Sequence, residues 1–404
     1  MITRRVFLKT GAVALSAFFA PRAVRRAAAA ERTPVLVALY LRGGADGLNL
    51  VVPAGDPAYY ASRPTIQVAR GHELPLDGFF GLNPVLAPLL PLYESGALAF
   101  VHAAGSPDPS RSHFDCQDFM ERAAPGDRSR VDGWLARYLA VAGGGKSIAG
   151  VTLRNARAKA LQGPAPSLAF ASLGAFSFTG PQVAERRATL DARYAVVTED
   201  TTAARTLGES ATQALDAVDL LATVERATDV VYPASELGSA LADAAALIKA
   251  EIGVRAIAVD LGGWDHHTDT GDRTEEVGGD LAASLAAFAA DLGPHAASTL
   301  TLAMTEFGRR VAENGGRGTD HGHGGVMLAL GGGVHGGRVL LAGGTWPGLA
   351  TDRLYRGQDL AVTTDFRSVF AEALHRHLLV NQTAVAAILP GFTIDPAAFP
   401  GLYV

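Results

Sequence analysis

The chain is 404 residues long, 48% of its residues are hydrophobic, and its formal net charge is −5. Residues 1–30 contain six basic residues and no acidic one, so removing them lowers the net charge to −11 for residues 31–404. An acidic chain of this kind is a poor candidate for binding nucleic acid or an anionic membrane surface. The single cysteine, Cys116, excludes an intrachain disulfide, so stability must come from a large apolar core.

Residues 1–30 have the features of a signal peptide for twin-arginine export. Residues 3–9 read TRRVFLK, an apolar stretch follows at residues 11–20, and residues 27–30 are four alanines that suit a cleavage site. The apolar stretch is too short for an ordinary membrane span. We therefore expect the twin-arginine machinery to export the protein to the periplasm or the extracellular space, with no stable membrane span after cleavage. The alternative is a basic N-terminus that arose by chance.

The first segment of the mature chain predicts a buried strand that ends at a candidate ligand. Residues 33–41, TPVLVALYL, form a continuous apolar run, which is typical of a parallel strand covered on both faces. The glycine-rich turn that follows carries Asp46, and open α/β sheets place ligand groups at this end of a strand. Asp46 fits a turn cap equally well. Residues 53–95 predict an ordered, loop-rich excursion, and residues 98–102 a second strand.

A possible nucleophile follows this second strand. After the turn residues 105–111, Ser112 is expected near the start of a helix, where its hydroxyl could attack an electrophile while helix-end amides and Arg111 hold an anion. The competing interpretation is that Ser112 is an ordinary helix cap. His113 and Asp115 are possible additional metal ligands.

The second half of the chain predicts alternating helices and strands. Residues 181–226 form an alanine-rich amphipathic pattern, so residues 181–240 are either a cap over the site or a plain insertion. Helices are expected at residues 235–252 and 274–292, with strands at residues 254–260 and 298–305. Such alternation implies a mostly parallel sheet with helices on its faces, in a single domain over residues 31–404.

Two histidine-rich loops form the strongest candidate metal site. One loop contains Asp265 and His267 after a predicted strand, and the other, GTDHGHGG at residues 318–325, contains Asp320, His321 and His323. Imidazole and carboxylate groups at this density suit Zn²⁺ or Mn²⁺, with Ca²⁺ or Mg²⁺ possible. Glu306 follows the next predicted strand and is either a ligand or a partner of a neighbouring arginine. Four segments thus bring Asp, His, Glu or Ser to one edge of one sheet.

These motifs together resemble the secreted bacterial family called domain of unknown function 1501. The segments that carry the resemblance cover nearly the whole chain: LRGGADGLNLVVP, GSPDPSRSHFDCQDFMERAAPG, GGWDHHTD, TEFGRR, GTDHGHGG and TTDFRSVF. The family in turn resembles the alkaline phosphatase and sulfatase superfamily. That resemblance implies a three-layer α/β sandwich with a mostly parallel central sheet, and a site of two metals beside a nucleophile.

The superfamily resemblance also implies roles for individual residues. Asp46 would match the metal carboxylate after the first strand, and Ser112 the nucleophile. Asp265 and His267 would belong to one metal site, with His321 or His323 as its last histidine. The chain departs from the phosphatase pattern at Glu306-Phe307, where an Asp-His pair is usual, so either Glu306, Asp320 and His321 form a second site or only one ion binds. No formylglycine sulfatase signature surrounds Ser112.

The activity that follows from this resemblance is hydrolysis of a phosphate or sulfate ester outside the cytoplasm. One or two divalent ions would activate Ser112 or a water and polarise the ester, and Arg42, Arg111 or Arg309 would hold the anion. The substrate would be a small-molecule or glycan ester. The alternative is a non-catalytic, metal-binding envelope protein that binds a glycan or an exported partner.

Overall fold

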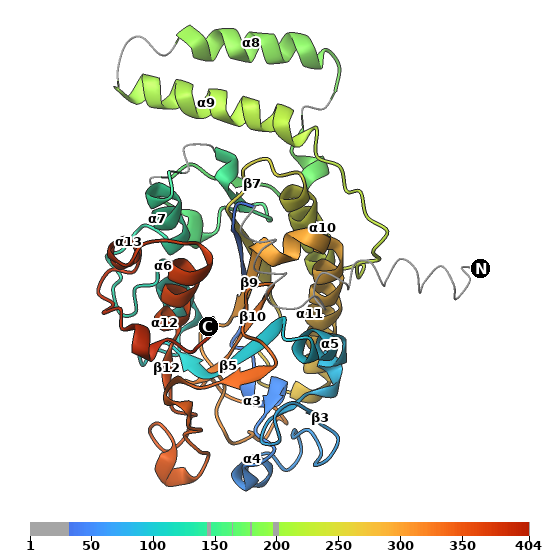
Figure 1. Cartoon of the computed structure of the whole chain (residues 1–404), viewed down its shortest axis with the longest axis vertical. Coiled ribbons are helices and arrows are strands. Elements are labelled where there is room, and N and C mark those ends of the chain that lie inside the picture. The colour runs from blue at the N-terminus through green and yellow to red at the C-terminus, as the bar shows by residue number, and fades with distance from the viewer. Residues whose placement is uncertain (1–31, 144–146, 164, 178–179, 197–201, 404) are drawn as a thin grey trace, which may run out of the picture.

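The computed structural model describes residues 32–143, 147–163, 165–177, 180–196 and 202–403 (Figure 1). The export signal expected at residues 1–30 lies outside the described residues. Within these ranges, no helix combines the length and the apolar character that crossing a membrane requires.

A nine-stranded sheet forms the centre of the fold. Its strands follow one another in the order β11 (Arg338–Leu340), β5 (Leu98–Gly105), β10 (Gly325–Gly331), β9 (Thr299–Met304), β1 (Val35–Leu41), β8 (Ala256–Leu261), β6 (Gly150–Thr152) and β7 (Leu168–Ala169). The ninth strand, β12 (Thr364–Asp365), pairs with β5. The apolar runs at residues 33–41 and 98–102 are therefore strands, as their patterns predict.

The direction of β10 sets the arrangement of the site. β10 pairs antiparallel with both β5 and β9, while every other pairing in this sheet is parallel. The carboxyl ends of β1, β5, β8 and β9 consequently lie at the same edge as the amino end of β10. We call this edge the carboxyl edge. Loops that follow the parallel strands meet there with the loop at residues 318–324, which precedes β10.

Helices cover both faces of the sheet, and the predicted α/β architecture with a mostly parallel central sheet is confirmed (Figure 1). Along β1, the odd-numbered residues pack in one core cluster and the even-numbered residues in the other. The first cluster contains helices α5 (Leu90–Glu94), α10 (Glu236–Lys249) and α11 (Thr270–Leu292), with the 3-10 helix η1 (Pro84–Leu89). The second contains residues of α6 (His113–Arg122), α7 (Trp134–Val141), α12 (Phe366–Glu372) and α13 (Gln382–Ile388). The alternation follows from the two-residue period of a strand that is buried on both sides.

The predicted loop-rich excursion at residues 53–95 contributes two strands to a second, smaller sheet. β2 (Val51–Val52), β4 (Gly81–Leu82) and β3 (Leu74–Pro75) pair antiparallel in that order, next to the short helices α3 (Gly47–Leu50) and α4 (Pro57–Ser62). A separate feature is the glycine-rich turn after β1, where Gly43 lets the backbone approach the loop after β8 closely. Gly43 has φ +120°, and a Cβ at this position would lie 2.5 Å from the backbone nitrogen of Asp265.

Residues 181–240 contain a hairpin of α8 (Val183–Val196) and α9 (Thr202–Leu221). α9 packs on η2 (Ser147–Ala149), which leads directly into the amino end of β6. In Figure 1 the hairpin lies at the top of the molecule and α3, which follows β1, near the bottom. The hairpin therefore lies at the end opposite to the carboxyl edge, where it does not cover groups on that edge.

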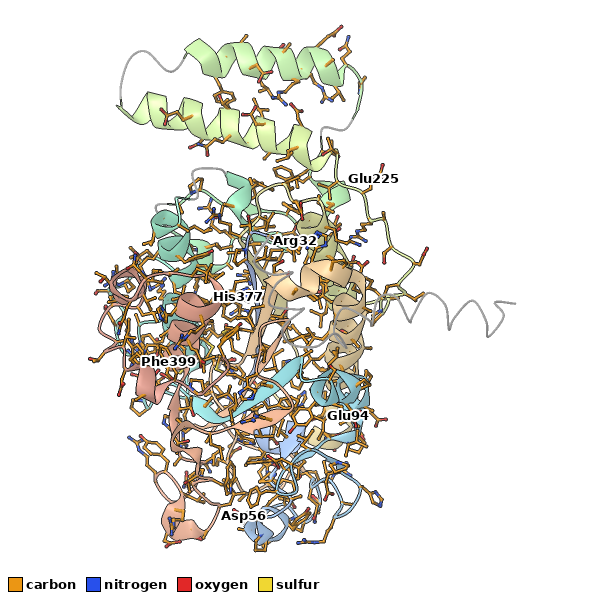
Figure 2. The ribbon with its side chains drawn as sticks, viewed as in Figure 1. Arg32, Asp56, Glu94, Glu225, His377 and Phe399 are labelled. Carbon is orange, nitrogen blue, oxygen red and sulfur yellow. The ribbon has the colours of Figure 1, made fainter. Side chains whose placement is uncertain are left out.

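The C-terminal part of the chain packs back onto the start of β1. The π-helix η8 (Ala373–His377) continues α12, and His377, which Figure 2 labels, donates a hydrogen bond from Nε2 to the Val35 carbonyl at 2.9 Å. Burial lowers the pKa of His377 to about 4. The remaining 3-10 helices of the described ranges are η3 (Lys159–Leu161), η4 (Leu173–Ala175), η5 (Gly293–Ser298), η6 (Ala342–Gly344), η7 (Thr351–Arg353) and η9 (Pro396–Ala398).

Candidate metal centre

Three imidazole rings converge on one carboxylate at the carboxyl edge. Asp265 Oδ1 lies 3.0 Å from His267 Nε2 and 3.1 Å from His321 Nε2, and Asp265 Oδ2 lies 3.4 Å from His113 Nε2. The Nε2 atom of His321 is 3.0 Å from the Nε2 atoms of both other histidines. We call His113, Asp265, His267 and His321 the histidine–aspartate cluster. Within it, His113, Asp265 and His321 offer ligand atoms that all lie within 4.8 Å of one another, so these three could hold a metal ion.

The opposite ring nitrogens face oxygen atoms. His113 Nδ1 lies 2.7 Å from Glu306 Oε1, and His321 Nδ1 lies 2.9 Å from the Arg111 carbonyl oxygen. His267 Nδ1 faces Asp320 Oδ1 at 3.6 Å. When Nε2 of such a ring binds a metal ion, the ring proton is on Nδ1, where these carboxylate and carbonyl oxygens can accept it. Metal-binding histidines are oriented in the same way by oxygen atoms behind the ring.

The charges around the cluster favour a bound cation. Burial by itself would raise the pKa of Asp265, but hydrogen bonds from Arg309 and His321 outweigh it and lower this pKa to about 2. Burial would also raise the pKa of Glu306, yet His113 and Gln117 lower it below its ordinary value. Burial lowers the pKa of His321. Asp265 is therefore a carboxylate at neutral pH, and the lowered pKa of His321 favours the neutral ring that metal binding requires. The hydrogen bond to Glu306 raises the pKa of His113, so a metal ion must displace a proton from the charged form of this ring.

The cluster is partly open to solvent. The side chains of Asp265 and His267 are 47% and 44% exposed, and those of His113 and His321 are 24% and 22% exposed. Structural zinc sites are usually closed by four protein ligands, whereas catalytic sites keep one position accessible. An open rim of this kind suits a site that admits a small molecule.

Arg309, which the sequence suggested as an anion-binding residue, lies beneath the cluster and joins three loops. Its guanidinium donates to Gly44 O at 2.7 Å, Thr319 O at 3.0 Å, Trp264 O at 3.1 Å and Asp265 Oδ1 at 2.7 Å, and also to Gly43 O. The side chain is 0% exposed. A guanidinium that is fully buried with these partners is not accessible to a substrate anion.

Three other residues proposed from the sequence have different partners. Asp46 forms a buried ion pair with Arg63, with Nη1 2.7 Å from Oδ2. Arg42 pairs with Glu121 at 2.9 Å and with Asp260 at 2.8 Å. The His323 ring stacks on Tyr355 with 4.4 Å between ring centroids, and burial lowers its pKa to about 4. The histidine that approaches Asp265 from the loop before β10 is thus His321, because His323 is occupied by this stacking contact.

Ser112 is the N-cap of α6, where its hydroxyl accepts a hydrogen bond from the backbone N–H of Asp115 at 3.5 Å. Both sequence neighbours contact the cluster. The Arg111 carbonyl orients His321, and His113 is a member of the cluster. The Arg111 side chain pairs with the buried Asp359 and is 25% exposed. Ser112 therefore caps the helix at the border of the cluster.

His113 is a member of the cluster, although the sequence indicated it only as an additional ligand. It begins α6 directly after the cap, and the first turn of this helix points its ring at Asp265 and His321. Asp115, the other additional candidate on this helix, instead pairs with Arg128 at 2.6 Å. The sequence predicted His113 only as a possible additional ligand near the start of the helix that follows the turn at residues 105–111.

Fold and site together define an α/β protein with a candidate metal centre at the carboxyl edge of its central sheet. Residues 99–389 match the model of the family described as "Protein of unknown function (DUF1501)", and the chain therefore belongs to this family. No curated protein matches the chain, and no solved structure does.

Proposed function

We propose that the protein is an exported, metal-dependent hydrolase that acts on a phosphate or sulfate ester. The observation that carries the proposal is the convergence of three Nε2 atoms on Asp265, with an oxygen atom behind each ring. The cluster lies at the carboxyl edge of the central sheet in a three-layer α/β fold, and this position supports a relation to the alkaline phosphatase and sulfatase superfamily. Three imidazoles and one carboxylate suit Zn²⁺ or Mn²⁺.

His113, Asp265 and His321 would hold the ion and leave its fourth position open to water or substrate, with the exposed His267 beside it. A divalent ion at this position supplies Lewis-acid chemistry, since it polarises an ester oxygen and lowers the pKa of a hydroxyl or water. Arg111, which is 25% exposed next to the cluster, would contact the phosphate or sulfate oxygens. The rim of the site would leave the organic part of the ester in solvent.

Ser112 is the proposed nucleophile because it lies between two residues that contact the cluster. Its hydroxyl oxygen would bond to phosphorus or sulfur while the ester oxygen leaves as an alcohol with the hydroxyl proton. Water would then hydrolyse the serine ester, return a proton to Ser112 and release phosphate or sulfate. N–H groups at the start of α6 would stabilise the negative charge that develops on the transferred group.

The direct test is metal binding and turnover by the purified mature protein. Zinc or manganese content would be measured, and aryl phosphates and aryl sulfates would be assayed with added Zn²⁺, Mn²⁺, Mg²⁺ and Ca²⁺. We expect His321→Asn to lose both the metal and the activity. His295→Asn is a matched control, because His295 lies in η5 before the amino end of β9, at the opposite edge. Retained metal and activity in His321→Asn would refute the assignment of the site.

One observation favours a second candidate, a non-catalytic metal-binding envelope protein that binds a glycan or an exported partner. Phe307 packs against His113 and His321, with 4.8 Å between ring centroids in each case, where the superfamily pattern has a metal-binding histidine. An apolar ring there leaves room for a single ion. Bound metal without turnover of any ester tested would favour this candidate over the hydrolase.

Export is tested separately. Replacement of both Arg4 and Arg5 by lysine should leave the full-length protein in the cytoplasm if residues 1–30 direct twin-arginine export. Cell fractionation with an antibody to the mature chain measures this outcome. Unchanged export of the double variant would contradict the proposed localisation and would leave the metal site unaffected.

A further inference from the structure

A hydrogen-bonded chain extends from the histidine–aspartate cluster into the interior of the protein. His113 and Gln117 are four residues apart on α6, so both side chains leave the helix on the same side. Both reach the same atom, Glu306 Oε1. His113 Nδ1 lies 2.7 Å from it, and Gln117 Nε2 donates to it at 2.8 Å.

The orientation of the Gln117 amide is determined by its two partners. Its oxygen accepts a hydrogen bond from Arg42 Nη1 at 3.2 Å, while its nitrogen donates to Glu306. An arginine only donates and a carboxylate only accepts, so the opposite amide orientation would lose both bonds. Glutamine meets both requirements with one neutral, planar group.

The two ends of this chain are held in place. Arg42 is anchored by Glu121 and Asp260, at 2.9 and 2.8 Å. The Glu306 side chain is 2% exposed, and its Oε1 also accepts from the backbone N–H of Gly43 at 2.9 Å. Its other oxygen accepts from the Thr305 hydroxyl at 3.1 Å. The carboxylate therefore has little freedom to turn away from His113.

We propose that Gln117 is a positioning residue for metal binding. By fixing the Glu306 carboxylate, it holds the His113 ring with its proton on Nδ1 and its Nε2 lone pair toward Asp265. The inference rests on the metal site of the proposed function but not on hydrolysis. Outer partners of metal-binding histidines change metal affinity by about 10–100-fold when they are removed.

Two substitutions separate positioning from simple packing. Gln117→Met keeps the approximate size of the side chain and removes both hydrogen bonds, whereas Gln117→Glu keeps the acceptor for Arg42 and removes the donor to Glu306. Asp118→Asn is the control on the same helix, because Asp118 pairs with Lys159 and Arg122. The dissociation constant for Zn²⁺ would be measured by competition with a chromophoric chelator, and the folded state by thermal unfolding.

We expect both Gln117 variants to bind Zn²⁺ about 10-fold more weakly than the wild type, the lower end of the range for direct partners, because Gln117 acts on His113 through Glu306. Asp118→Asn should bind within about twofold of the wild type. A second readout is the ¹⁵N NMR spectrum of histidine-labelled, metal-free protein, with His113 assigned from a His113→Asn variant. His113 should carry its proton on Nδ1 in the wild type and populate the other tautomer in Gln117→Met.

Wild-type affinity together with an unchanged His113 tautomer in both variants would overturn the role of Gln117. Because neither readout involves turnover, a wild type that binds Zn²⁺ without hydrolysing any ester would overturn only the hydrolase proposal. If a variant fails to fold, the other variant still gives both readouts. If the wild type binds no Zn²⁺, the metal-free spectra still test the effect of Gln117 on His113.

Discussion

Replacing Arg309 by methionine separates two roles for this residue, joining loops or binding a substrate anion. Its guanidinium is 0% exposed and donates to carbonyl groups of three loops as well as to Asp265. Methionine would remove every one of these donors and leave buried acceptors unpaired. Removing one partner of a buried ion pair costs about 3–5 kcal/mol. Since Asp265 is 47% exposed and can recruit water, we expect the lower value, about 3 kcal/mol.

The assay is the free energy of unfolding in urea, measured together with Zn²⁺ affinity. We expect Arg309→Met to lose about 3 kcal/mol of stability, and to lose about 10–100-fold in Zn²⁺ affinity because Asp265 is no longer held in place. Arg310→Met is the matched control. Arg310 is 35% exposed and pairs with the exposed Asp320 at 3.3 Å, so its loss should cost about 1 kcal/mol or less. Wild-type stability and Zn²⁺ affinity in Arg309→Met, with a raised KM for an ester substrate, would refute the loop-joining role.

Three further predictions concern Ser112, acid stability and the hairpin. Ser112→Ala should lose about 1 kcal/mol of stability because α6 loses its N-cap, and it should still bind Zn²⁺. Ester hydrolysis should fall at least about a thousandfold, and activity near the wild-type level would exclude Ser112 as the nucleophile. Burial lowers the pKa of His377 to about 4, below the unfolded value near 6.5, so the unfolded state binds the extra proton between these values. Protonation of His377 should therefore lower the free energy of unfolding by roughly 3 kcal/mol between pH 6.5 and pH 4. Urea titrations of His377→Gln should lack this part of the decrease, and a pH dependence equal to that of the wild type would contradict this account. Replacing residues 180–224 with a short Gly-Ser linker should leave Zn²⁺ affinity within about twofold, because the hairpin packs at the amino-terminal edge of the sheet; a large loss of affinity would show that the hairpin supports the site.

The sequence by itself determined the strands and the segments that follow them. Short continuous apolar runs that end in glycine turns, such as residues 35–41, favour central strands that are buried on both faces. Parallel strands then bring their following loops to one edge whatever the details of packing. Asp265, His267 and the loop that contains His321 and His323 were therefore found from pattern and spacing, while the superfamily resemblance named His321 and His323 as alternatives.

Only the tertiary structure decided which side chains meet. β10 runs against its neighbours, so the loop before it reaches the edge where the other strands end, and contacts with Asp265 and Tyr355 then separate His321 from His323. The structure also shows that His113 contacts Asp265 and His321, and that Arg309 donates hydrogen bonds to carbonyl groups of three loops. The direction of a side chain at this edge depends on partners more than a hundred residues away in the chain, such as Glu306 for His113. These partners cannot be read from the local sequence.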